Sequence, residues 1–386
     1  MGSPMPRAIR VVVAGGGTGG HLFPGIAIAQ EIVHRNPDSR VQFIGTDKPF
    51  EQEAVARAGF THRSVSAEGI KGRGLWRSLR ASVKLPVGLL QAMAMLLRFR
   101  PDLVIGVGGY SSGPVVLGAW LLGIPTALHE QNLLPGITNR MLSRVANRVY
   151  VSFGESADHL GPAKSLLTGN PVRREFLSRL ADRSPSPAGG TQPFTILVVG
   201  GSQGAHAINQ AVMDGLHLLP DRDRVRFFHQ TGSADEARVQ AAYAAAGVTN
   251  ITKAFFHDMA RHYREADLVI CRAGATTVAE VTAMGKGILF IPFPHAADDH
   301  QRLNAGALAD QGAAEVILES ELDGARLAQR IHYYRNHPEA LREMGQKAAA
   351  MGRPDAAAAI VDDCYRQLFN GSPESPRRQD NGSDVS

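Results

Sequence analysis

The sequence predicts an α/β protein in which two parallel β-sheets form two domains that face each other across a cleft. Short runs of β-branched and aliphatic residues alternate with segments of helical periodicity, which is typical of parallel sheets covered by helices on both faces. The pattern starts twice, with strands expected at 11–14 and 195–199, and a glycine-rich loop follows each of these strands. A chain of 386 residues, 44% of them hydrophobic, is long enough for two such Rossmann-like domains.

The first half of the chain continues this alternation after its opening strand. A helix is expected from Leu22 to His34, because apolar residues recur there with helical spacing. The segment 103–128 carries no formal charge and is long enough to span a bilayer. Its glycines and prolines favour a strand, a glycine loop, a helix and a second strand over a transmembrane helix. Buried strands are expected in this half at 11–14, 41–44, 103–107, 126–128 and 149–151.

The second half repeats the pattern after a segment rich in Ser, Pro and Gly. We expect residues 178–193 to form a linker or long loop between a domain at 7–177 and a domain at 194–368. The last helix is expected to pack back on the first domain, and the polar tail 371–386 to be disordered. The strands expected in this half are 195–199, 225–228, 268–271, 288–291 and 315–317.

Composition and charge limit the class of protein. The two cysteines, Cys271 and Cys364, exclude a disulfide scaffold and a zinc site built on cysteines, and they favour a reducing compartment. The net charge is +5, and the segment 61–100 holds eight basic residues against one acid. Apolar residues are interspersed with basic ones between 70 and 100, which suits either an anionic membrane surface or a core helix with a solvated basic face. Aromatic residues are few and no RNA-binding motif is present, so nucleic-acid binding is not expected.

Two glycine loops in the first half are candidate anion sites. Residues 15–20 match the pattern G-x-G-x-x-G between a strand and a helix, where backbone N–H groups and the helix dipole attract an anion. A dinucleotide is one interpretation, with Asp47 as the acid that binds its ribose. His21, at the start of the helix, is either a general base or a residue that caps the loop. The loop 108–114 is a second candidate for a pyrophosphate, or a tight turn that needs glycine at positive φ.

Further polar clusters follow the ends of other strands. Residues 129–132 suit the hydroxyl or amide groups of a ligand, or form a satisfied polar loop. Arg173 suits a phosphate or a nucleobase carbonyl, or makes a surface ion pair. In the second half, loop 200–204 offers donors to a phosphate, and Glu280 suits either two ribose hydroxyls or the dipole of its own helix. The Asp and His residues at 295–300 lack the compact spacing of metal ligands, so no metal is expected.

Six motifs occur in one order along the chain: Gly16-Gly17-Thr18-Gly19-Gly20-His21, Gly108–Pro114, His129-Glu130-Gln131-Asn132, Gly169–Arg173, Gly200–Gly204 and Gly274–Glu280. Together they resemble the MurG family of peptidoglycan N-acetylglucosaminyltransferases, from about residue 11 to about residue 362. The resemblance implies an inverting glycosyltransferase of GT-B architecture. It implies transfer of N-acetylglucosamine from UDP-GlcNAc to the 4-hydroxyl of N-acetylmuramoyl-pentapeptide on undecaprenyl pyrophosphate, which converts lipid I to lipid II. It also implies that neither a metal nor a cofactor takes part.

The resemblance further implies roles for individual residues. The catalytic base is expected to be His21, with Glu130 as the alternative, because inversion needs a group that deprotonates the acceptor hydroxyl. The donor is expected to contact Thr18, Gly19, Gly20, Asn132, Arg173, Ser202, the backbone of Phe256, Ala275, Thr276, Thr277, Glu280 and Gln301. The acceptor is expected to contact Gly17, His21, Gly109, Tyr110, Ser111 and His129.

The resemblance places the protein as a peripheral protein at the cytoplasmic face of the bacterial inner membrane. The basic and apolar stretch 70–100 is expected to dock on anionic lipid, and other cell-wall enzymes are candidate partners. Three alternatives stay open at this point. They are an NAD-dependent oxidoreductase, a GT-B transferase that acts on another acceptor, and a membrane-surface binding protein without catalytic activity.

Overall fold

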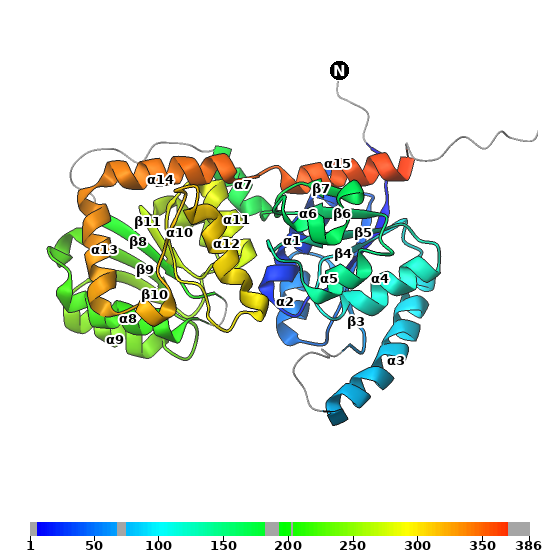
Figure 1. Ribbon diagram of the computed structural model, residues 1–386, viewed down its shortest axis with the longest axis horizontal. Helices are drawn as coiled ribbons and strands as arrows, with labels where there is room; N and C mark the ends of the chain where they lie inside the picture. Colours follow the sequence, from blue (N-terminus) through cyan, green and yellow to red (C-terminus); the bar gives the residue numbers. More distant parts are fainter. Residues whose placement is uncertain (1–5, 68–74, 182–192, 202–203, 370–386) are drawn as a thin grey trace, which may run out of the picture.

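The computed structural model describes residues 6–67, 75–181, 193–201 and 204–369. These residues form two lobes that lie side by side, each built around one sheet (Figure 1). The expected linker falls mostly on 182–192, and the expected tail on 370–386, so both lie outside the described residues. Ser202, in the glycine loop 200–204 of the second half, lies outside them as well.

The first lobe contains a seven-stranded parallel sheet. Its strand order is β3-β2-β1-β4-β5-β6-β7, so the chain reverses direction across the sheet between β1 and β4. The strands are β1 (Arg10–Ala14), β2 (Arg40–Gly45), β3 (Thr61–Ser64), β4 (Leu103–Gly106), β5 (Thr126–Glu130), β6 (Arg148–Val151) and β7 (Ser165–Leu167). The helices are α1 (Gly19–Arg35), α2 (Pro49–Arg57), α3 (Leu75–Phe99), α4 (Ser112–Leu121), α5 (Ile137–Leu142) and α6 (Ser156–Leu160). The next helix, α7 (Arg174–Ala181), already packs on the second lobe, where Phe176 joins the buried core.

The second lobe contains a six-stranded parallel sheet with the order β10-β9-β8-β11-β12-β13. Its strands are β8 (Phe194–Val199), β9 (Val225–Gln230), β10 (Thr249–Lys253), β11 (Leu268–Cys271), β12 (Gly287–Phe290) and β13 (Glu315–Val316). Its helices are α8 (His206–Gly215), α9 (Glu236–Ala246), α10 (Met259–Glu265), α11 (Ala275–Met284), α12 (His300–Ala309), α13 (Gly324–Asn336) and α14 (Pro338–Met351). The last helix of the chain is α15 (Ala356–Phe369).

The central strands are apolar at consecutive positions because both of their faces are covered. Val11 and Val13 of β1 pack into one buried cluster, whereas Val12 packs into another on the opposite face of the sheet. Strand β8 divides its residues between two clusters in the same way, with Ile196 in one and Leu197 in the other. This alternation produces the continuous apolar runs from which the sequence predicts a parallel sheet.

The strand order places the glycine-rich loops together at one edge of each sheet. In an open parallel sheet, ligands bind beyond the carboxyl ends of the two strands between which the order reverses. These strands are β1 and β4 in the first lobe, and β8 and β11 in the second. A glycine-containing loop follows each of the four strands, so we expect a ligand to bind beyond these loops, in the region between the lobes that is called the crevice below.

The chain crosses between the lobes a second time near its end. After α14, which lies in the second lobe, α15 packs against α1 of the first lobe (Figure 1). The buried carboxylate of Asp363 accepts hydrogen bonds from Arg148 at 2.8 Å and from the Tyr150 hydroxyl at 3.1 Å. Asp362 forms an ion pair with Arg35 of α1. The end of the chain therefore ties the two lobes together.

Candidate active site between the two lobes

A hydrogen bond joins the two lobes at the starts of α1 and α11. The Thr276 hydroxyl donates to the carbonyl of Gly20 at 3.3 Å. That carbonyl lacks a partner within α1, because the residue four positions later is Pro24, which has no N–H group. The predicted residues Gly20 and Thr276 therefore meet across the crevice.

The first glycine loop is fixed from behind by Glu51, a residue that the sequence analysis missed. The carboxylate of Glu51 is fully buried and accepts hydrogen bonds from the Gly17 N–H at 2.6 Å and the Thr46 N–H at 2.9 Å. Burial alone would raise the pKa of Glu51, but His62 and the hydrogen bonds from Thr46 and Gly17 lower it to about 2. The N–H of Gly17 is thus unavailable to a ligand, which leaves the amides of Thr18, Gly19 and Gly20 as candidate anion donors at this helix start.

The two glycine loops of the first lobe pack closely on each other. Gly108 and Gly109 have φ angles of 92° and 80°, which favour glycine. A Cβ atom on Gly109 would lie 2.4 Å from the carbonyl oxygen of Gly16, and one on Gly108 would lie 2.8 Å from Nδ1 of His21. The interpretation of 108–114 as a turn that needs positive φ therefore holds at these two glycines, and they leave room for the His21 ring.

His21 is linked through Gln131 to His129. Its Nδ1 atom lies 2.9 Å from Oε1 of Gln131, and Nε2 of Gln131 lies 3.0 Å from Nδ1 of His129. His129 is completely buried, and burial lowers its pKa to about 4. Both ring nitrogens of His129 have partners within the protein, the second being the carbonyl of Gly169 at 3.2 Å. His129 therefore lies behind His21 rather than at the surface of the crevice.

Glu130 and Asn132 organise the loop after β5. The buried carboxylate of Glu130 accepts hydrogen bonds from the backbone of Asn132 and Gly136 and from the side chain of Asn139. Asn304, from α12 of the second lobe, donates to the Asn132 side chain at 3.2 Å and accepts from the N–H of Leu133 at 3.1 Å. Asn304 is a second residue that the sequence pattern did not reveal, and it joins the two lobes through Asn132 and Leu133.

Tyr110 and Ser111 differ in exposure at the end of β4. The side chain of Tyr110 is exposed, whereas Ser111 is fully buried. The hydroxyl of Ser111 has no hydrogen-bond partner among the described residues. A buried hydroxyl without a partner is costly, so Ser111 is a candidate donor or acceptor for a bound ligand.

Arg173 lies between the lobes, as its expected contact with a ligand requires. Its guanidinium is 3.2 Å from the carboxylate of Glu280 on α11 and lies over the ring of Phe23 on α1, 4.7 Å from the ring centre. Glu280 is buried, and this burial raises its pKa, although Arg173 acts in the opposite direction. Glu280 is thus a buried acid in the second turn of α11, and Arg173 is its cationic partner among the described residues.

Gln230 connects the two parts of the candidate nucleotide site in the second lobe. Its buried amide donates to the carbonyl of Gly201 at 2.9 Å and accepts from the N–H of Phe256 at 2.9 Å. The backbone N–H of Phe256 is therefore already used, and its carbonyl is the group left for a ligand. The sequence analysis missed Gln230, which is the last residue of β9.

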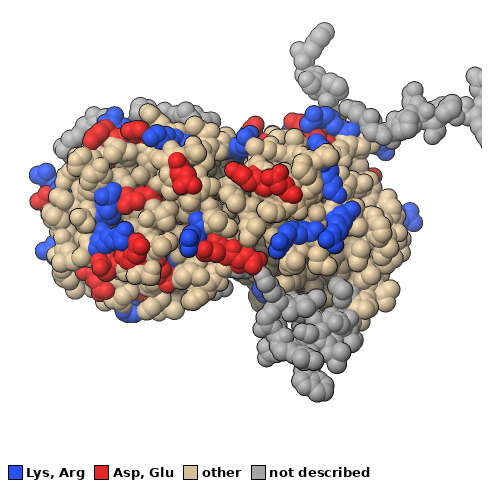
Figure 2. Space-filling view, in the orientation of Figure 1, with Lys and Arg blue, Asp and Glu red and all other residues tan. Residues whose placement is uncertain are grey.

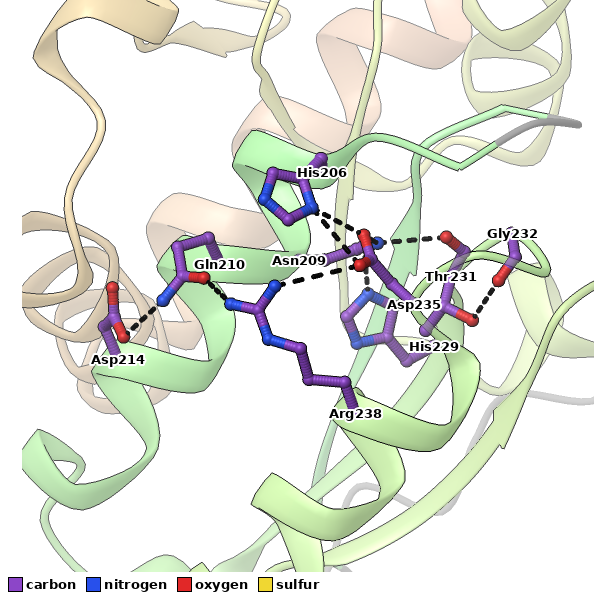
Figure 3. Close-up of polar contacts among 9 residues, drawn as sticks. All are labelled: His206, Asn209, Gln210, Asp214, His229, Thr231, Gly232, Asp235 and Arg238. Atoms are coloured by element: carbon purple, nitrogen blue, oxygen red, sulfur yellow. Dashed lines mark hydrogen bonds and ion pairs between the residues drawn. The ribbon is translucent and has the colours of Figure 1, made fainter.

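A buried polar network holds the start of α8, directly after the second glycine loop (Figure 3). Asp235 accepts hydrogen bonds from His206 at 3.0 Å and from Asn209 at 2.8 Å. Asn209 also donates to the carbonyl of Thr231 and accepts from His229, whose pKa burial lowers to about 3. This network fixes the start of α8 through His206 and Asn209.

Gln301 is the second residue of α12, directly after the loop that follows β12. Its side-chain oxygen accepts from the N–H of Phe293 at 3.0 Å, while Arg272 donates to the carbonyl of Ile291 at 3.0 Å. Among the described residues, no three His, Cys, Asp or Glu side chains gather as a metal site requires. Ala275 is buried and Thr277 half-buried in the first turns of α11, next to Thr276.

The comparisons with known proteins agree with this arrangement. Residues 11–151 match the glycosyltransferase family 28 N-terminal domain, and residues 195–360 match its C-terminal domain. A UDP-N-acetylglucosamine--N-acetylmuramyl-(pentapeptide) pyrophosphoryl-undecaprenol N-acetylglucosamine transferase of Trichlorobacter lovleyi is 47% identical over 92% of this chain and 97% of its own length. The relative of that name in Myxococcus xanthus is 46% identical over 95% of this chain and 97% of its own length.

Solved structures show the same fold. The crystal structure of Acinetobacter baumannii MurG superimposes with a TM-score of 0.72 at 33% identity, covering 92% of this chain and 98% of that one. A Neisseria meningitidis UDP-GlcNAc 2-epimerase, 13% identical with a TM-score of 0.67 over 93% of this chain and all of that one, shares the fold alone. The expected GT-B fold is confirmed, and the oxidoreductase alternative is rejected. The chain belongs to glycosyltransferase family 28, among the N-acetylglucosamine transferases of the MurG family.

Proposed function

We propose that the protein transfers N-acetylglucosamine from UDP-GlcNAc to the 4-hydroxyl of undecaprenyl-linked N-acetylmuramoyl-pentapeptide, which converts lipid I to lipid II. The observation that carries this proposal is the contact between Gly20 and Thr276. It brings the start of α1, which bears His21, against the start of α11, the helix that carries Glu280 in its second turn. The names of the relatives in Trichlorobacter lovleyi and Myxococcus xanthus support both substrates.

For the donor, we propose that Glu280 accepts hydrogen bonds from the ribose hydroxyls and that Arg173 lies beside the nucleotide. A buried carboxylate that has one cationic partner supports this role, because charge-assisted hydrogen bonds are strong where water is excluded. Phe256 would contact the base through its carbonyl, since its N–H donates to Gln230. The remaining proposed donor contacts are Thr18, Gly19, Gly20, Asn132, Ser202, Ala275, Thr276, Thr277 and Gln301.

For the acceptor, we propose direct contacts from Tyr110 and Ser111. The exposure of Tyr110 and the unpartnered hydroxyl of Ser111 support these contacts. Gly17, Gly109 and His129 would shape the acceptor site from behind, because their described groups are engaged within the protein or packed against it.

In the proposed reaction, Nε2 of His21 takes the proton of the acceptor hydroxyl. The oxygen attacks the anomeric carbon from the face opposite UDP, a new C–O bond forms, and the bond from C1 to the β-phosphate oxygen breaks. The electron pair leaves with UDP, and the configuration inverts. The helix N-termini and Arg173 would offset the charge that develops on the diphosphate. Glu130 is less suited to be the base, because its oxygens already accept several bonds from its own loop.

We also propose that the first lobe docks peripherally on anionic lipid at the cytoplasmic face of the inner membrane. Exposed apolar side chains support this, and they lie on the neighbouring helices α3, α4 and α5. They are Val87, Leu90 and Leu97 on α3, Trp120 and Leu121 on α4, and Ile137 and Met141 on α5. Within the described part of the chain, no helix is both long and apolar enough to cross a bilayer. Side chains 70–85 of the expected docking stretch lie outside the described residues.

On the face shown in Figure 2, both lobes carry basic as well as acidic side chains. In Figure 2, Lys and Arg residues alternate with Asp and Glu residues over the lobe that contains the second sheet. Charge on this face does not distinguish the lobes, so the docking role is assigned to the first lobe through its exposed apolar patch on α3, α4 and α5, which lipid would bury.

The test is transfer from radiolabelled UDP-GlcNAc to a short-chain lipid I analogue in excess EDTA. Glu280→Gln is compared with Glu175→Gln, because both carboxylates contact Arg173. We expect lipid-linked disaccharide from the wild type, a KM for UDP-GlcNAc raised about 10- to 100-fold in Glu280→Gln, and a change within about twofold in Glu175→Gln. Product only with a different acceptor would contradict the proposal. Product that disappears only with EDTA would keep the reaction and reject its metal-free form.

A further inference from the structure

We infer that Gln131 is a positioning residue that holds His21 with its proton on Nδ1, which leaves the lone pair on Nε2 for the acceptor hydroxyl. The inference rests on the proposed function, in which His21 is the base. It concerns which ring nitrogen of His21 carries the proton, and it follows from the hydrogen bonds around the buried amide of Gln131.

The orientation of the Gln131 amide is fixed by the backbone. Its Nε2 atom lies 2.9 Å from the carbonyl oxygen of Val107 and 3.2 Å from that of His129. A carbonyl oxygen only accepts hydrogen bonds, so the group that faces these two oxygens must be the NH₂ end of the amide. Gln131 is 1% exposed, and the reversed amide would bury an oxygen against two other oxygens.

This orientation determines the tautomer of His21. With the NH₂ group on the backbone carbonyls, the amide oxygen is the atom 2.9 Å from Nδ1 of His21. An amide oxygen has no proton to give, so Nδ1 must donate and therefore carries the hydrogen. In the neutral ring the other nitrogen, Nε2, is then the acceptor, and no partner is found for it among the described residues.

The same argument assigns the protons of His129, at the other end of this series of hydrogen bonds. Its Nε2 faces the carbonyl of Gly169 at 3.2 Å and therefore donates, while its Nδ1 accepts from Gln131 at 3.0 Å. Burial lowers the pKa of His129 to about 4, so the ring is neutral at physiological pH and Nδ1 is free to accept. The carbonyls of Val107 and Gly169 thus permit a single arrangement of protons over three side chains.

The surroundings of His21 also limit rotation of its ring and the charges that act on it. Gly108 packs against the ring so closely that a Cβ atom there would lie 2.8 Å from Nδ1. His129 is a titratable group that interacts electrostatically with His21. Two acids belong to neighbouring elements, but Glu130 is bonded to its own loop and Glu51 to Gly17 and Thr46. The partner that directly contacts His21 is therefore a neutral amide.

The first test measures the tautomer without activity. Side-chain ¹⁵N NMR of histidine-labelled full-length protein distinguishes a ring with the proton on Nδ1 from one with the proton on Nε2, and a His21→Gln variant assigns the signal. We expect the Nδ1–H form for His21 in the wild type. The Nε2–H form would overturn the inference even if the enzyme is fully active. Conversely, an active His21→Gln variant would reject His21 as the base and leave the tautomer result intact.

The second test measures the pH dependence of kcat/KM. In Gln131→Glu, a carboxyl oxygen replaces the NH₂ group against the carbonyls of Val107 and His129, so the new side chain must take up a proton or turn away, and the acidic limb of the profile should shift by about half a pH unit or more. Gln131→Met keeps the volume and removes the hydrogen bonds, and it should lower kcat about 10- to 100-fold with KM for UDP-GlcNAc little changed. The matched control is Gln230→Met, another buried amide at a strand end, which should raise that KM and leave the acidic limb in place. An unchanged limb in Gln131→Glu together with an unchanged kcat in Gln131→Met, in variants whose circular dichroism matches the wild type, would overturn the inference.

Discussion

The carboxylate of Glu51 shows how one residue determines what a glycine loop can bind. It holds the N–H of Gly17 at 2.6 Å and lies so close to Gly16 that a Cβ atom there would be 2.4 Å away. Burial opposes ionisation, but the contacts with His62, Thr46 and Gly17 lower the pKa of Glu51 to about 2. A lowered pKa means that the ionised group stabilises the fold at neutral pH, and that this contribution is lost as the pH falls from about 4.5 to about 2.

We therefore expect Glu51→Gln to lower the free energy of unfolding at pH 7 by about 2–3 kcal/mol. The variant should also show a flatter decline in stability between pH 4.5 and pH 2 than the wild type. Urea denaturation at a series of pH values measures both effects. Glu53→Gln, on the same helix but exposed and paired with Arg57, is the control and should change stability by less than about 1 kcal/mol. Equal effects of the two substitutions would contradict this account of Glu51.

At this scale the sequence indicates where loops and polar residues lie, but not which of their hydrogen-bonding groups are available to a ligand. The pattern at 15–20 correctly indicates a loop between a strand and a helix, but Glu51 lies 34 residues beyond Gly17 and no local motif points to it. Gln131 and Gln230 are uncharged and lie at strand ends, where a polar residue is common. Their importance follows from the backbone carbonyls around them, which only the fold brings together. The roles assigned to His21, Arg173 and Glu280 stay predictions.

At the scale of elements, Pro24 links the structure of α1 to the contact between the lobes. The missing N–H of proline leaves the Gly20 carbonyl without a helical partner, and Thr276 supplies a donor from α11. Pro24→Ala restores the N–H, which should bond to Gly20 and compete with Thr276. We expect an unchanged or higher melting temperature together with a KM for UDP-GlcNAc raised about fivefold.

A double-mutant cycle tests this link. Thr276→Val removes the same hydrogen bond. The double variant with Pro24→Ala should therefore have a KM for UDP-GlcNAc no higher than that of Thr276→Val alone. Pro49→Ala, at the first position of α2, is the control because it frees no carbonyl across the crevice. If the effects of Pro24→Ala and Thr276→Val on KM for UDP-GlcNAc are instead additive in free energy, the two residues act separately.

The sequence predicts the central elements well, and the edge strands poorly. The expected strands at 11–14 and 195–199 correspond to β1 and β8, whose residues are buried on both faces. Strands β3, β7 and β10 are missed, because edge strands such as Thr61–Ser64 are short, partly exposed and polar. Their pairing is decided by the neighbouring strand rather than by their own hydrophobic pattern.

At the scale of the whole molecule, α15 joins the two lobes through Asp363. Its carboxylate is buried against Arg148 and Tyr150, whereas the neighbouring Asp362 is exposed and pairs with Arg35. Removing one partner of a buried ion pair leaves the other uncompensated, so Asp363→Asn should destabilise the protein by about 3 kcal/mol or more. Asp362→Asn should change stability by less than about 1 kcal/mol. Thermal unfolding of both variants measures the difference, and similar melting temperatures would contradict it.

The apolar patch on α3, α4 and α5 gives a second prediction at this scale. Leu90 and Met141 are 68% and 63% exposed. We expect Leu90→Glu to reduce co-sedimentation with anionic vesicles about tenfold or more, because burial of one leucine contributes about 2 kcal/mol. The control is Ile251→Glu, an exposed apolar position on β10 of the second lobe. An equal reduction of co-sedimentation in the two variants would show that the lipid contact lies elsewhere.

The most direct test of the central claim is the anomeric configuration of the disaccharide that the purified protein makes from UDP-GlcNAc and a lipid I analogue. UDP-GlcNAc carries an α-linked sugar, so a single displacement assisted by His21 must give a β-linked product. Proton NMR of the isolated product reads this from the coupling of the anomeric proton, which is large for the β form. A β-linked disaccharide is the predicted result. An α-linked product, or none, would contradict the account.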